Sequence, residues 1–71
     1  MMEAVRVYED HRGWRFMVMP GLGNEYKARY VKPGKKGWHC VATLPWRASL
    51  ERAQEDLDAY AASHHMQEVE A

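Results

Sequence analysis

Hydrophobic and polar residues alternate over four short stretches of the chain, which is the pattern of strands that bury one face of a sheet. The stretches are AVRVY (4–8), WRFMVM (14–19), YKARYVK (26–32) and GWHCVATL (37–44). Turn-forming sequences separate them, and KPGK (32–35) carries Pro and Gly at the central positions of a type II turn. The pattern predicts strands at about 4–8, 14–19, 26–32 and 37–44.

The spacing of apolar residues changes to three and four after residue 49, which predicts one amphipathic helix over about 49–64. Ser49 is the expected N-cap, and the first turn contains an acid, which suits the helix dipole. The apolar stripe is Leu50, Ala53, Leu57, Tyr60, Ala61 and His64. The side facing away from it is expected to hold Glu51, Gln54, Glu55 and Asp58. We expect the tail, residues 66–71, to be frayed.

Consecutive strands joined by short turns favour an antiparallel meander, and one helix covers only one of its faces. The expected fold is therefore α+β, a single domain of 1–71 in which three to four strands precede one packed helix (β-β-β-β-α). The covered face is assigned Val5, Val7, Trp14, Phe16, Val18, Tyr26, Ala28, Tyr30, Trp38, Cys40, Ala42 and Leu44. The opposite face, which we term the open face, is assigned Arg6, Tyr8, Arg15, Met17, Met19, Lys27, Arg29, Val31, His39, Val41 and Thr43.

Charge divides unequally along the chain, although the net charge is zero. Residues 1–47 contain nine Lys and Arg against four acids, whereas residues 48–71 contain one Arg against six acids. Residues 26–47 carry six cations and no acid, and the open face as assigned also carries no acid. Such asymmetry indicates an anionic partner or self-complementary association.

Two functions fit a basic open face. It could bind duplex DNA, with cations on phosphates and base edges and the KPGKKG turn on the backbone. The candidate nucleic-acid-binding residues are Arg6, Arg15, Lys27, Arg29, Lys35, Lys36 and His39. Alternatively, apolar side chains on the same face bind a second copy or a small protein partner. The candidate interface residues are Met17, Met19, Val31, Val41 and Trp46. A simpler alternative is that the cations only keep an exposed sheet soluble and protect its edges.

The run from WRFMVM through YKARYVKPGKKGWHCVATLPWRASLERAQEDL resembles the arm-type (AP2-like) DNA-binding domain of tyrosine recombinases. That resemblance implies three antiparallel strands, a closing helix and basic strands that read the major groove. It implies DNA contacts by Arg15, Lys27, Arg29, Lys35 and Lys36, and a free-standing copy would be an accessory protein of a mobile element.

A second resemblance implies a protein partner instead. The segments AVRVYEDHRGWRFMVMPGLGN and SLERAQEDLDAYA are similar to HicB-type antitoxin domains, with YKARYVKPGKKGWHCVA inserted between them. In that family two strands and a turn precede a helix that begins Ser/Thr-Leu-Glu. The small protein that such a domain would bind is a different class of partner from DNA.

The sequence predicts neither a catalytic site nor a metal site nor a cofactor, so a non-enzymatic binding protein is expected. His39 and Cys40 are neighbours in a strand and point to opposite faces, and His64 and His65 are about 100° apart on a helix. Cys40, the only cysteine, is expected to be a buried structural thiol, which fits a cytoplasmic setting. The sequence contains no apolar stretch of 18 residues, so we expect no membrane partner. Trp46 is either a lid over the helix start or an exposed interface anchor.

Overall fold

The structure is a computed structural model that describes residues 5–69. Within that range the elements are β1 (Val7–Glu9), β2 (Arg15–Pro20), β3 (Tyr26–Val31), β4 (His39–Cys40), α1 (Leu50–Ser63) and β5 (Gln67–Val69). Residue 4 of the first predicted strand and residues 70–71 of the predicted tail lie outside the described residues.

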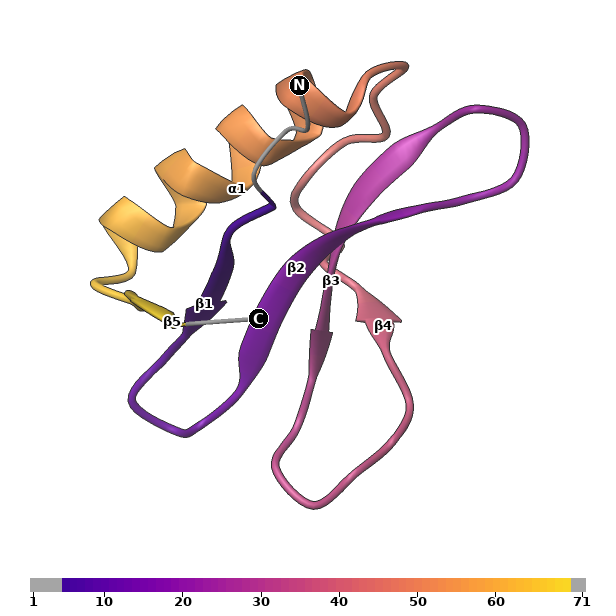
Figure 1. Cartoon of the computed structure of the whole chain (residues 1–71). Helices are drawn as coiled ribbons and strands as arrows, with labels where there is room; N and C mark the ends of the chain where they lie inside the picture. The colour runs from indigo at the N-terminus through magenta and orange to yellow at the C-terminus, as the bar shows by residue number, and fades with distance from the viewer. Residues whose placement is uncertain (1–4, 70–71) are drawn as a thin grey trace.

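The strands form one antiparallel sheet in the order β4-β3-β2-β1-β5, and α1 packs against β2 and β3 (Figure 1). This confirms the predicted α+β fold with a helix on one face. The expectation of a frayed tail is wrong for residues 67–69, because they form a fifth strand that places Val69 opposite Val7. His65, in the left-handed region with a φ of 57°, turns the chain after α1 so that β5 covers the edge of β1.

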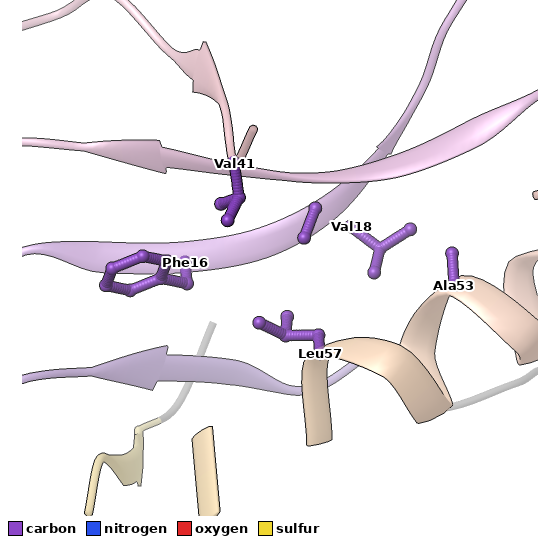
Figure 2. Packing of buried hydrophobic residues seen from close by; sticks show 6 residues of the cluster. Phe16, Val18, Val41, Ala53 and Leu57 are labelled. Carbon is purple, nitrogen blue, oxygen red and sulfur yellow. The ribbon is translucent and has the colours of Figure 1, made fainter. Parts of the chain in front are cut away.

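The core lies between α1 and the middle of the sheet (Figure 2). Phe16 and Val18 of β2 and Ala28 of β3 are buried, as their alternation predicts, and Leu57 of α1 is fully buried. Each buried aliphatic or aromatic side chain stabilises the fold by roughly 1.5–3 kcal/mol relative to exposure. Because these side chains of β2 and β3 are buried against α1, the residues that alternate with them lie on the open face.

The helix begins and ends as the sequence predicts. The Oγ of Ser49 accepts a hydrogen bond from the backbone N–H of Arg52 at 3.1 Å, so Ser49 is the N-cap. His64 is the C-cap, and its backbone N–H donates to the carbonyl of Tyr60 at 3.0 Å. Its ring stacks on that of Tyr60 with 4.1 Å between the centroids. These contacts satisfy backbone groups that a helix end otherwise leaves without partners.

The last predicted strand is shorter than expected and its faces are reversed. The strand is limited to His39–Cys40, and the N–H of Val41 still donates to the carbonyl of Ala28 on β3. The chain then turns, with the N–H of Leu44 donating to the carbonyl of Val41. Tyr30 is opposite His39 and Arg29 is opposite Cys40, so His39 lies on the helix side and Cys40 on the open face. Val41 is a core residue, not an open-face interface residue, and Cys40 is exposed. A shift of one residue exchanges every side chain of a strand between the two faces.

The first strand is also reversed relative to the prediction. Tyr8 is opposite Phe16, and its hydroxyl donates to the carboxylate of Asp58 on α1 at 2.7 Å. Arg6 also contacts Asp58, so it lies on the helix side and is not a DNA-binding residue of the open face. Gln54, expected to face away, is buried, and its Oε1 accepts from the backbone N–H of Arg6. The prediction that Gln54 and Asp58 face away from the sheet is therefore wrong.

Candidate nucleic-acid interface

The hairpin of β2 and β3 supplies the centre of the open face. Arg15 is opposite Val31, Met17 is opposite Arg29, and Met19 is opposite Lys27. Directly opposite residues project to the same side of a sheet, so these six predicted site residues lie together. Each of the three opposed pairs consequently places one cation beside one apolar side chain. The buried Nε of Arg29 has no hydrogen-bond partner among the described residues.

The prediction that the open face carries no acid is wrong. Glu9 of β1 is opposite Arg15, and the Nε of Arg15 lies 3.1 Å from a carboxylate oxygen of Glu9. The two residues form an exposed ion pair that costs little to break, because such pairs contribute only about 0–1 kcal/mol. Arg15 remains a candidate, with its charge partly offset by Glu9.

Trp46 lies beside the open face. Of the two placements expected for it, a lid over the helix start or an exposed side chain, the structure has the exposed one. Arg47 pairs with Tyr26, so the register continues with Trp46 opposite Lys27, whose Nζ is 5.4 Å from the indole centroid. Its indole is 41% exposed and lies over Gly21. A Cβ at Gly21 would be 2.4 Å from the indole Cζ3, so only glycine leaves room for this placement.

A second group of side chains lies on the helix side of the sheet, at the end next to the β3–β4 loop. The rings of Trp14 and Tyr30 stack with 5.2 Å between centroids and an interplanar angle of 13°. The ring of His39 follows at 5.6 Å from that of Tyr30. We term Trp14, Tyr30 and His39 the aromatic row. It crosses from the start of β2 over β3 to β4, and His39 at its end is exposed.

Cations surround the aromatic row. The guanidinium of Arg12 lies 3.6 Å from the indole centroid of Trp14, and the Nζ of Lys32 lies 5.0 Å from it. Next to the row is an open concavity of about 430 Å³, which is lined by Tyr30, Lys32, Lys35, Lys36, Gly37 and His39. No acid lines it.

The turn at the margin of this concavity has the geometry that KPGK predicts. The N–H of Lys35 donates to the carbonyl of Lys32 at 3.1 Å, and Gly34 has a φ of 78°. That φ is required at the third position of a type II turn and favours glycine. The turn places Lys35 and Lys36 in the exposed loop, as expected.

Ion pairs leave most of the basic segment unneutralised. Four of the ten Lys and Arg residues have carboxylate partners, namely Arg6, Arg12, Arg15 and Arg47. The other six form no ion pair within residues 5–69. Five of the six lie between residues 27 and 36, and the sixth is Arg52 on α1. The available positive charge is therefore concentrated on β3 and its following loop.

The paired cations are held by structural contacts. Arg47 donates hydrogen bonds to the carboxylate of Asp56, and these bonds together with the attraction between the two charges raise the pKa of the guanidinium. Burial opposes ionisation of Asp10, but hydrogen bonds from Arg12 and from the backbone N–H of Trp14 lower the pKa of its carboxyl. The side chain of Arg12 is thereby tied to the turn before β2 and lies over Trp14.

The predicted site residues thus divide into separate groups. Arg15, Lys27 and Arg29 share the open face, whereas Lys35, Lys36 and His39 share the loop concavity on the other side. Trp14, Tyr30 and Lys32 were not among the predicted site residues; the alternation placed Trp14 and Tyr30 on the covered face. A usable signal was present, since Trp14 lies between Arg12 and Arg15 in the sequence and Lys32 directly follows β3.

No family model, curated protein or solved structure matches this chain. The resemblances to arm-type DNA-binding domains and to HicB-type domains therefore stay predictions. In residues 5–69 no helix is long and apolar enough to cross a membrane. The same residues contain no group of three His, Cys, Asp or Glu side chains arranged to hold a metal ion.

Proposed function

We propose that the protein is a small non-enzymatic nucleic-acid-binding protein. The observation that carries this proposal is the set of five cations between residues 27 and 36 that form no ion pair within the described residues, namely Lys27, Arg29, Lys32, Lys35 and Lys36. Cations in so short a segment repel one another unless an anionic partner neutralises them.

Phosphates are the anions that this arrangement suits best. Lys27 and Arg29 project from one face of β3, and the lysines of the following loop continue the positive charge beyond its end. A nucleic-acid backbone presents phosphates at regular short intervals, and each neutralised phosphate releases condensed counterions. Duplex DNA against the open face remains the first partner to test, since Lys27, Arg29 and Arg15 share that face.

Fluorescence anisotropy with labelled nucleic acid tests the proposal. We expect binding to a duplex of about 20 base pairs, weakening at least tenfold between roughly 50 and 200 mM salt. K27A/R29A and K35A/K36A should each weaken binding and lower the salt slope by about one or two contacts. Arg52→Ala is the matched control, because Arg52 is an exposed cation on α1 that forms no ion pair within residues 5–69. Absence of salt-sensitive binding to duplex and to single strands, even at low ionic strength, would refute the function.

A second candidate function is a protein interface on the open face. The exposed indole of Trp46 favours it, because it lies at the end of the face that also presents Met17 and Met19. Trp is enriched among the residues that dominate protein interfaces. Such an interface predicts association that resists salt, whereas phosphate binding predicts steep loss with salt.

A further inference from the structure

We propose that the concavity beside the β3–β4 loop binds a single-stranded segment of nucleic acid, with one base stacked on His39. This proposal rests on the nucleic-acid-binding function and specifies one of its sites. The site consists of the exposed end of the aromatic row together with the loop lysines, which line the same concavity of about 430 Å³.

The aromatic row ends in a ring that is open to a ligand. β4 is the edge strand of the described sheet, and His39 is exposed while its ring lies against Tyr30 at 5.6 Å between centroids. The His39 ring is tilted by 39° from that of Tyr30, and a nucleobase placed on its exposed side would extend the aromatic row by one ring. Base stacking on an aromatic side chain tolerates any base, because every base has an aromatic face.

The rest of the row holds this ring in position. Tyr30 is half-buried and contacts both Trp14 and the core residue Phe16, with 6.0 Å between the Tyr30 and Phe16 centroids. Trp14 is in turn covered by the guanidinium of Arg12. A platform that is already ordered loses little conformational entropy when a ligand binds.

The charge of the concavity selects an anionic ligand. Lys32, Lys35 and Lys36 line it together with the stacking groups, and no acid does. A strand with its base on His39 would carry its flanking phosphates past these lysines. A duplex does not fit this contact, because its bases are already stacked on one another and their faces are covered.

Substitution of His39 separates stacking from charge. We expect His39→Ala to weaken binding of an oligothymidine of about 12 nucleotides by roughly tenfold, the effect of losing one stacked base. His39→Phe should retain the affinity, because the ring is kept without the imidazole nitrogens. Binding of duplex DNA should not change in either variant. Thr43→Ala is the control, as an exposed residue near the same edge.

Amide resonances provide a second readout that does not depend on the variants. Titration of the wild-type protein with the same oligonucleotide should shift the amide signals of Lys35, Lys36 and Gly37 before those of β1 and β5. His39 is exposed, so equal thermal midpoints for the variants and the wild type are expected and verify folding.

The outcomes distinguish the two proposals. Two results would contradict the stacking site but not the nucleic-acid function. In the first, K35A/K36A weakens binding and His39→Ala does not. In the second, His39→Phe binds as poorly as His39→Ala. If the strand shifts signals only on the open face, the site is likewise wrong. If neither single strand nor duplex binds at low salt, both proposals fail together.

Discussion

Asp58 ties the first strand to the helix through one carboxylate. Its oxygens accept hydrogen bonds from the guanidinium of Arg6 at 3.1 and 2.6 Å, from the hydroxyl of Tyr8 and from the side-chain amide of Gln54. The hydrogen bond from Arg6, opposed by partial burial, lowers the pKa of the Asp58 carboxyl to about 2. Burial and the hydrogen bond to Asp58 raise the pKa of Tyr8, and Asp58 also raises that of Arg6. A substitution here therefore affects three partners at once.

Asp58→Asn should lower the free energy of unfolding by about 1–2 kcal/mol at pH 7, after allowance for the partial exposure of the pair. A carboxyl whose pKa is lowered by folding stabilises the fold above its unfolded pKa and loses that effect as the pH falls through its folded pKa. The difference between wild type and variant should therefore be complete above about pH 5, fall as the pH is lowered and vanish only below about pH 2.

Urea denaturation at a series of pH values measures this difference. Glu55→Gln removes an exposed acid of the same helix and should change the unfolding free energy by less than about 0.5 kcal/mol at every pH. A pH-independent cost of Asp58→Asn would show that shape and hydrogen bonding, rather than charge, hold β1 to α1.

At the scale of elements, strong local signals predicted the structure well and weak ones did not. Long alternation in WRFMVM and YKARYV gave β2 and β3 their correct faces, and Ser49 with a three- and four-residue stripe located α1. The short edge elements depend on tertiary contacts. In GWHCVATL the more apolar parity is Trp38, Cys40, Ala42 and Leu44, but the chain adopts the other one and turns after Val41, whose side chain enters the core.

The same limit applies to the site. The cations of β3 and its loop are evident from composition, but their division between two sides depends on the register of β4. The fifth strand has no local signal, because Gln67–Val69 is short and polar and pairs only after α1 and His65 bring it to β1. Arg6 could not be placed correctly without knowledge that Asp58 faces it.

Paired substitutions in β4 test its register directly. Val41→Ala should lower the unfolding free energy by roughly 2 kcal/mol, because Val41 packs in the core with Phe16 and Leu57. Cys40→Ala should cost less than about 0.5 kcal/mol, because Cys40 is exposed on the open face. Denaturation in urea gives both values under one set of conditions. A larger cost at Cys40 than at Val41 would restore the parity that the sequence alone predicts.

At the scale of the whole molecule, charge and apolar area compete on the open face. Most dimers of identical chains are symmetric about a two-fold axis, so the same patch of each copy would meet its equivalent. Lys27 and Arg29 lie opposite Met19 and Met17 respectively, and a symmetric contact through the methionines would bring the cations of the two copies together. Like charges brought together oppose association, and more strongly at low salt. The cations thus suppress the contact that the apolar side chains favour.

Neutralising those two cations should therefore promote self-association. We expect wild type to be monomeric in light scattering at low salt, and K27Q/R29Q to form dimers at the same concentration, because Met17, Met19 and Trp46 then meet without repulsion. K35Q/K36Q has the same net charge but leaves the open face unchanged, and it should remain monomeric. A wild-type dimer that persists at low salt would contradict this prediction. It would mean that Lys27 and Arg29 have partners within the dimer. It would then favour the protein-interface function over nucleic-acid binding on this face.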